Sequence, residues 1–313
     1  MPVFRFKYFD VQNERSAMKV NTDGVLLGAL MTVRPGDTRL LDIGTGTGVV
    51  ALMAAQRLVG RNQDGPCASP GIFADTGPGP DAAQSKAPVC KTDGNPGKNT
   101  AYDGEPVHKC GGDVNPENYE GIMIEAIDVD EASAEEAAAN FAASPWSAGM
   151  SSRHLSLDGL AGELASCRQD WKYDHIFSNP PYFESSLKAP DARRRAARHA
   201  DTLSYRDIIS FAAQRLTERG ILSMILPSDA ETSARRYAAS WSLPLFRIVR
   251  VRTTPRHPVS RTVMEFSRPG TNGISGYPSS PVPTQPVAEM LTIRNEGGYS
   301  EEYRSLTSEF LFI

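Results

Sequence analysis

The sequence contains no run of about 18 consecutive apolar residues, the length that a membrane-spanning helix requires. Residues 1–7 also lack the apolar core of a secretory signal peptide. The four cysteines include no C-x-x-C pair, which argues against a zinc ribbon and against a dithiol redox motif. These absences predict a cytoplasmic protein with no membrane segment and no metal site.

Composition indicates a chain with a substantial core. The 313 residues are 40% hydrophobic, and the formal net charge of −4 does not suggest a general nucleic-acid binder. We predict one domain over residues 1–313, interrupted by a Gly/Pro-rich insertion at 61–119 and a Pro/Ser/Gly-rich loop at 269–286. The insertion has almost no apolar periodicity, so we expect it to be disordered. The sequence assigns no role to this insertion or to its cysteines, Cys67, Cys90 and Cys110.

Short apolar strands alternate with helical segments along most of the chain. The expected strands are 39–43, 121–128, 153–157, 173–178 and 220–226, and the expected helices are 49–58, 131–142, 204–216 and 228–241. A hairpin at 245–252 and 261–266, a strand at 290–293 and a helix from about 300 to 310 follow. This order predicts an α/β fold with a mostly parallel, seven-stranded sheet, an antiparallel C-terminal hairpin and helices on both faces.

A glycine-rich turn, residues 44–48, joins the first of these strands to the helix 49–58. Alternate glycines, Gly44, Gly46 and Gly48, let the backbone approach a ligand closely, and the helix amino end offers free N–H groups. The spacing is G-x-G-x-G, with Asp42 two residues before the first glycine, and it differs from the pyrophosphate-binding G-x-G-x-x-G. It suits a ligand with an amino-acid moiety and a nucleoside that carries no phosphate.

Acidic residues end two further expected strands. Asp128, at the end of the second strand, is placed to accept hydrogen bonds from ribose hydroxyls, with Asp130 as the nearest competitor. Asp158 follows the strand 153–157. It could accept a hydrogen bond from an adenine amine, or it could simply form a turn before Gly159.

The tetrapeptide Asn179-Pro180-Pro181-Tyr182 follows the apolar strand 173–178, so it should lie at the carboxyl edge of the sheet, where ligands bind in open α/β sheets. Two prolines make a stiff turn without N–H donors, which presents the Asn179 side-chain oxygen and the Pro180 carbonyl as acceptors. A planar NH2 group could satisfy both. Tyr182 offers a face on which a base could stack.

Residues 17–24 precede an apolar stretch at 25–30. Asn21, Thr22 or Asp23 could cap a helix there. A capped helix that covers one end of the domain is one interpretation. Alternatively, Lys19, Thr22 and Asp23 form part of a ligand or substrate wall, and the sequence leaves both interpretations open.

Basic residues follow the Pro-Pro turn. Residues 188–199 contain four arginines and a histidine against one acid, Asp191. If the segment is helical, Arg194, Arg195 and Arg198 share a face. A solvated face is the usual explanation of such a charge run, but its place directly after the turn favours phosphate binding.

Four stretches together resemble the bacterial methyltransferase family that modifies N6 of adenosine 37 in the valine tRNA. They are AMKVNTDG at 17–24, LDIGTGTG at 41–48, NPPY at 179–182 and YSEEY at 299–303. The amino-terminal block is the most family-specific, whereas many methyltransferases share the glycine loop. The resemblance implies a Rossmann-like class I methyltransferase, S-adenosylmethionine as cofactor and tRNA as substrate. We expect a monomer.

With the patterns above, the resemblance predicts roles for individual residues. The predicted cofactor-binding residues are Lys19, Thr22, Asp42, Gly44, Gly46, Gly48, Asp128, Asp158 and Asn179. The predicted catalytic residues, at the target base, are Asn179, Pro180 and Tyr182. The predicted RNA contacts are Arg193, Arg194, Arg195, Arg198, His199 and, in the hairpin loop, Arg256.

Three other functions remain open from the sequence. The first is methylation of a glutamine side chain in a protein, because a glutamine amide offers the same two donors to the same turn. The corresponding enzymes carry a helical domain before the glycine loop, whereas only about forty residues precede the loop in this sequence. Methylation of adenine in DNA or rRNA is the second, without an evident target-recognition domain. The third is a catalytically silent RNA-binding module that keeps the fold, which titration with labelled cofactor would distinguish.

Overall fold

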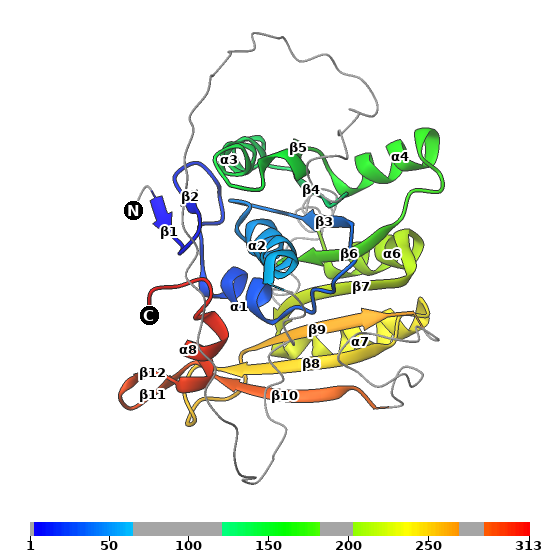
Figure 1. The fold of residues 1–313 in the computed structure, drawn as a ribbon. Helices are drawn as coiled ribbons and strands as arrows, with labels where there is room; N and C mark the ends of the chain where they lie inside the picture. Colours follow the sequence, from blue (N-terminus) through cyan, green and yellow to red (C-terminus); the bar gives the residue numbers. More distant parts are fainter. Residues whose placement is uncertain (1–2, 65–120, 182–202, 269–284) are drawn as a thin grey trace, which may run out of the picture. The chain divides into compact units, whose positions relative to one another are not determined.

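A mixed sheet of eight strands forms the centre of the described structure (Figure 1), in the order β10-β8-β9-β7-β6-β3-β4-β5. Strands β7, β6, β3, β4 and β5 run parallel, β9 is antiparallel to β7 and β8, and β10 is parallel to β8. The bounds are β3 Arg39–Ile43, β4 Met123–Asp128, β5 Met150–His154, β6 Tyr173–Ser178, β7 Leu216–Pro227, β8 Leu245–Arg252, β9 Arg261–Ser267 and β10 Val287–Thr292.

The computed structural model describes residues 3–64, 121–181, 203–268 and 285–313. All of them belong to one unit of the chain, whereas a second unit, residues 71–113, lies outside the described residues, as do most of the predicted insertion and of the 269–286 loop. Within the described unit, the mostly parallel sheet and the antiparallel hairpin of β8 and β9 are confirmed. The predicted count of seven strands is wrong, because β10 pairs with the outer edge of β8 as an eighth strand.

Helices cover both faces of the sheet, as predicted (Figure 1). Helices α4, α6 and α7 pack on one face, where their apolar side chains meet those of β3, β6, β7, β8 and β9 in one buried cluster. Helices α1, α2 and α3 lie on the other, and the short α8 packs against α1 and β10. The bounds are α1 Thr22–Leu30, α2 Val49–Asp64, α3 Glu131–Ala142, α4 Leu157–Cys167, α6 Tyr205–Arg215, α7 Glu231–Ser240 and α8 Glu301–Thr307, with short 3-10 turns η2 Ser147–Gly149 and η4 Ser228–Ala230.

Small hairpins flank the sheet at both ends of the chain. Strand β1 (Val3–Arg5) pairs with β2 (Asp10–Gln12) in antiparallel fashion. Near the carboxyl end, β11 (Arg294–Asn295) pairs with β12 (Gly298–Tyr299), which the sequence pattern did not predict because each strand is only two residues long. This second hairpin leads directly into α8.

Several predicted boundaries are wrong: β7 begins at Leu216 and not at residue 220, β5 begins at Met150 and not at residue 153, and the predicted limits of β5 and α2 also fail at their carboxyl ends. Strand β5 ends at His154, because the Ser156 side chain accepts a hydrogen bond from the Gly159 N–H at 3.1 Å and so caps α4. Asp158 therefore lies in the first turn of that helix and does not end a strand. Helix α2 continues to Asp64, whereas the predicted helix ended at residue 58.

A chain of buried polar groups crosses the strands β6, β7, β9 and β8. The Ser223 hydroxyl donates to Glu265 Oε1 at 2.9 Å, so the His175 ring, 2.8 Å away, donates its Nε2–H to Ser223. The guanidinium of Arg247 donates to the other Glu265 oxygen at 2.8 Å. His175 is fully buried and belongs to the core.

Burial of His175 should make the fold sensitive to acid. Burial lowers the pKa of this imidazole to about 3, against about 6.5 in an unfolded chain. As the pH falls from 6.5 towards 3, only the unfolded chain takes up this proton, so the free energy of unfolding should decrease by roughly 5 kcal/mol. Denaturant titrations at several pH values measure how steeply the free energy of unfolding falls with pH. The dependence should be weaker in His175→Gln, and an equally steep dependence in that variant would show that another group takes up the proton.

Candidate active site

The glycine turn between β3 and α2 has a backbone that only glycine adopts readily. Gly44, Gly46 and Gly48 have φ angles of 70°, 57° and 82°, all in the left-handed region. A Cβ atom at Gly48 would lie 2.5 Å from Cε1 of Phe141 on α3, so this position also needs the absence of a side chain. The N–H groups of Gly44 and Thr45 donate to the Ile127 carbonyl at 2.9 and 3.1 Å, which fixes the turn to the end of β4.

Two carboxylates hold this turn. Asp42, at the end of β3, is 1% exposed, and its Oδ2 accepts a hydrogen bond from the Thr45 hydroxyl at 2.8 Å. Burial, together with the nearby charge of Asp128, raises the pKa of Asp42 to about 7. Asp128 accepts from the Gly46 N–H and from the Asp130 N–H, both at 2.9 Å, and burial raises its pKa above the ordinary value as well. Each carboxylate oxygen has a second lone pair, so both acids can still accept from a ligand.

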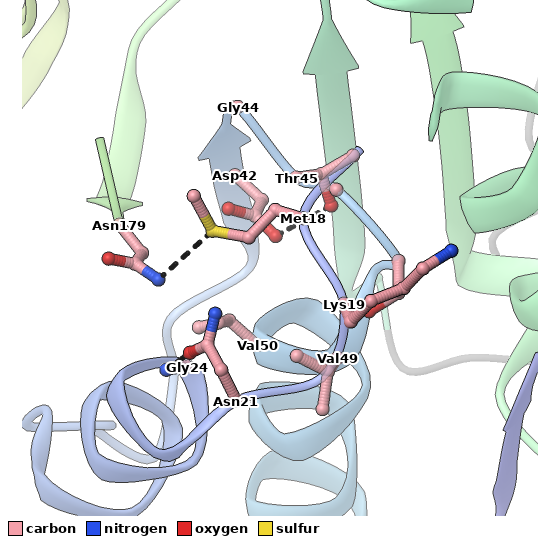
Figure 2. Close-up of a pocket in the computed structure, with 12 residues that line it drawn as sticks. Met18, Lys19, Asn21, Gly24, Asp42, Gly44, Thr45, Val49, Val50 and Asn179 are labelled. Carbon is pink, nitrogen blue, oxygen red and sulfur yellow. Dashed lines mark hydrogen bonds between the residues drawn. The ribbon is translucent and has the colours of Figure 1, made fainter. Parts of the chain in front are cut away.

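Asn179 lies beside the glycine turn. It directly follows β6, whose last residue, Ser178, donates from its hydroxyl to the Ile43 carbonyl at 2.7 Å and so joins the two strand ends. Asn179 is 9% exposed and lines the same cavity as Asp42 and Gly44 (Figure 2). Its amide Nδ2 donates to the sulfur of Met18 at 3.6 Å.

Met18 also lines this cavity. Figure 2 shows its side chain between Asn179 and the glycine turn. The cavity measures about 20 Å³, which is close to the room that one water molecule needs. Met18 is 37% exposed and its side chain is flexible, so it can move aside for a larger ligand.

The segment that carries Met18 is anchored to polar groups of α3. Glu136 is 2% exposed, and its carboxylate accepts hydrogen bonds from the backbone N–H groups of Glu14, Arg15 and Ser16 at 2.7 to 2.8 Å. These bonds lower the pKa of Glu136 against the effect of its burial. Ser133 and Asn140 of the same helix accept from the N–H groups of residues 17 and 12.

Sequence reasoning missed this anchoring function of α3. The signal was present, because Ser133, Glu136 and Asn140 share one helical face. A row of polar residues on an alanine-rich helix usually faces solvent, so the pattern alone did not predict a contact there. In the structure this row is buried against the amino-terminal segment of the chain.

The other predicted site residues are distributed over the carboxyl edge of the sheet. Lys19 lines the cavity, but its ammonium group donates to the Glu14 carbonyl. Asp158 is exposed on α4, and Pro180 is buried. Thr22 lines a different cavity, on the other side of α1. Arg256, in the loop after β8, makes an exposed ion pair of 3.2 Å with Glu296.

Several predictions concern residues outside the described ranges. These are Tyr182, the basic residues Arg193, Arg194, Arg195, Arg198 and His199, and the cysteines Cys67, Cys90 and Cys110. Over the residues that the structure describes, no group of three or more His, Cys, Asp or Glu side chains could hold a metal ion. None of the described helices is both long enough and apolar enough to cross a membrane.

Curated proteins match almost the whole chain. It is 31% identical over 309 residues to the tRNA1(Val) (adenine(37)-N6)-methyltransferase of Bacteroides thetaiotaomicron, which covers 99% of this chain and 97% of that protein. It is 33% identical over 312 residues to the protein of the same name from Porphyromonas gingivalis, which covers 98% and 94%. The chain belongs to this family of tRNA methyltransferases. The resemblance seen in the sequence is thereby confirmed, although no known family profile matches the chain.

A solved structure has the same architecture as this chain. The crystal structure of a predicted O-methyltransferase from Agrobacterium tumefaciens superimposes with a TM-score of 0.53, over 92% of this chain and 96% of the other. The sequence identity is 13%, so the likeness concerns the fold alone. It agrees with a Rossmann-like methyltransferase fold.

Proposed function

We infer that this enzyme transfers a methyl group from S-adenosylmethionine to N6 of an adenosine in tRNA, namely adenosine 37 of the valine tRNA. The names of the curated relatives support the reaction and the substrate. The observation that carries the proposal is that Asn179 and the glycine turn line one cavity at the carboxyl edge of the sheet. An acceptor for an amine thus lies beside a turn suited to the cofactor.

The residues around the cavity fit the cofactor by their chemistry. S-adenosylmethionine, when bound, supplies an electrophilic methyl group on a positively charged sulfur. Asp42 and Asp128 are the acids that would hold its polar groups, and the left-handed glycines allow the backbone close to it. We assign Asp128 to the ribose hydroxyls, since its oxygens keep lone pairs free for that purpose.

Asn179 and Pro180 would orient the target amine. The lone pair of an adenine amino nitrogen is delocalised into the ring, which makes this nitrogen a poor nucleophile. Hydrogen bonds from its two N–H groups to the Asn179 side-chain oxygen and the Pro180 carbonyl would favour a tetrahedral nitrogen whose lone pair points at the methyl group. No strong general base is required, because the proton becomes acidic once the nitrogen carries the methyl group.

The adenosine must leave the stack of the anticodon loop to reach Asn179, at a cost of a few kcal/mol. We propose that Tyr182 offsets part of this cost by stacking on the base, which is worth about 1–3 kcal/mol.

The arginines at 193–195 and 198, with His199 and Arg256, would contact phosphates of the tRNA. Neutralising these residues should therefore weaken the salt dependence of tRNA binding. We also propose that the enzyme acts in the cytoplasm and that it is a monomer. A molecular mass in solution above that of one chain would contradict the monomer.

Cofactor affinity should depend on pH through Asp42. This acid has a pKa of about 7 in the free protein, and its ionised form attracts a positively charged ligand. The dissociation constant should therefore rise about tenfold for each pH unit below 7 and level off above it. Calorimetric titrations at pH 6, 7 and 8 test this. Asp42→Asn should bind more weakly at pH 8 and show no such slope, and an unchanged slope would assign the titration to another group.

The modified nucleoside in cells tests the proposed function. N6-methyladenosine should disappear from position 37 of the valine tRNA when the gene is deleted, and it should return with the intact gene. A plasmid that carries Asn179→Ala should not restore it. Loss of a methylated glutamine in a protein, with unchanged tRNA, would instead support the glutamine methyltransferase alternative.

A further inference from the structure

A second cavity of about 320 Å³ opens at the same edge of the sheet and has no part in the site described above. Its walls come from α1, from the ends of β8 and β9, and from the β11–β12 hairpin with α8. Its lining includes Thr22, Asp23, Ser260, Arg261, Arg294 and Tyr299. The cavity thus combines planar groups, two arginines, a carboxylate and hydroxyls.

Planar side chains are stacked along one wall of this cavity. The rings of Tyr299 and Tyr303 are 5.1 Å apart with an interplanar angle of 24°, and the guanidinium of Arg294 lies 4.7 Å from the centroid of the Tyr299 ring. Tyr303 is buried, whereas Tyr299 and Arg294 are exposed. Among the described residues, no carboxylate lies within 4.0 Å of the Arg294 guanidinium, so its charge faces an aromatic ring and solvent.

The polar part of the cavity suits a ribose. Asp23 and Arg261 form an ion pair of 2.8 Å in its wall. Thr22 and Ser260 add hydroxyl groups that donate and accept. A planar base, a ribose and a phosphate would therefore each meet a matching group, namely the Tyr299–Arg294 stack, the hydroxyls with Asp23, and an arginine.

The first turn of α1 separates this cavity from the active site. Asn21 and Gly24 line the cavity that contains Asn179, whereas Thr22 and Asp23 line the second one. A helix is about 10 Å in diameter, a distance that about three nucleotides span at the ~3.4 Å rise of a stacked strand. A strand whose adenosine reaches Asn179 can thus place a near neighbour in the second cavity.

We propose that the second cavity binds one nucleotide of the substrate tRNA, close in sequence to the target adenosine. This inference rests on the proposed function for the identity of the RNA. The base extends the stack of Tyr303, Tyr299 and Arg294. The neighbouring phosphate is held by the guanidinium of Arg294 in the same wall. The stretch YSEEY at 299–303, which belongs to the family resemblance but has no role in the active site, thereby contributes Tyr299 and Tyr303 to RNA binding.

Equilibrium binding of an unmodified transcript of the valine tRNA tests the proposal. Tyr299→Ala should weaken binding about 5- to 150-fold, which is the loss expected for one base-stacking contact, while the kcat at saturating tRNA and the affinity for S-adenosylmethionine stay the same. Tyr299→Phe keeps the ring and should stay within about twofold of the wild type. Arg294→Gln should weaken binding and reduce its salt dependence by about one phosphate contact.

The matched control is Tyr8→Ala. Tyr8 is 64% exposed and does not line the cavity, so this variant should bind the transcript like the wild type. Unchanged binding in both Tyr299→Ala and Arg294→Gln would overturn the proposal. If Tyr299→Ala does not fold, Arg294→Gln decides alone, because its side chain is at the surface. A wild-type protein that binds the transcript without methylating it would contradict the proposed function but not the proposal that the second cavity binds a nucleotide.

Discussion

Replacing Asn179 with alanine should lower kcat by about 100- to 1000-fold and leave the affinity for S-adenosylmethionine within about twofold of the wild type. The side chain supplies one of two acceptors for the target amine, and a single positioned hydrogen bond of this kind is typically worth such a factor. Asn179 follows β6 and takes no part in the hydrogen bonds that hold the glycine turn to β4. The cofactor site should therefore survive its truncation.

Single-turnover kinetics and calorimetry measure these two quantities separately. Asn295→Ala is the control, since Asn295 is exposed in β11 and lines neither cavity. An Asn179→Ala enzyme with normal kcat would remove the residue from the reaction. Loss of cofactor affinity together with kcat would mean that the side chain organises the cofactor site instead.

Gly48→Ala should lower the free energy of unfolding by about 2–5 kcal/mol. The left-handed backbone costs about 1–2 kcal/mol for an alanine. The new methyl group would meet the Phe141 ring at 2.5 Å, and overpacking a core contact of this kind costs typically 1–3 kcal/mol. Urea denaturation of the wild type and the variant measures the difference.

The chain offers a control that separates strain from collision. Gly36 has a φ of 94°, and a Cβ atom there would meet nothing within 4 Å, so Gly36→Ala should lose only the strain energy. Shortening Phe141 to leucine in the Gly48→Ala background should recover part of the loss as a coupling energy. Equal losses at Gly36 and Gly48 would show that the contact with Phe141 is unimportant.

Local chemistry made most of the fold predictable. Buried strands such as 39–43 and 173–178 are short apolar runs between turn residues, and helix caps such as Ser204 precede a clear apolar period. Boundaries failed where two signals competed. The run 153–157 reads as a strand by composition, but Ser156 caps α4 and ends it early.

The candidate site was only partly predictable, because sequence identifies groups at the ends of strands but not what covers them. Asp42, Asp128 and Asn179 follow from the rule that parallel strands present their carboxyl ends at one edge. Met18 does not, since the segment that carries it is held by long-range hydrogen bonds that the backbone N–H groups of residues 14–16 donate to the Glu136 carboxylate. The second cavity is likewise invisible in the sequence, because it joins α1 to a hairpin more than two hundred residues later.

Nucleoside analysis of a purified reaction shows which atom of which nucleotide the enzyme methylates. The enzyme is incubated with S-adenosylmethionine and an unmodified valine tRNA transcript, and the digested RNA is examined by mass spectrometry. We expect one N6-methyladenosine per tRNA, at adenosine 37, and none when that adenosine is replaced by guanosine. A methyl group on another atom or another nucleotide, or methylation that Asn179→Ala leaves unchanged, would contradict it.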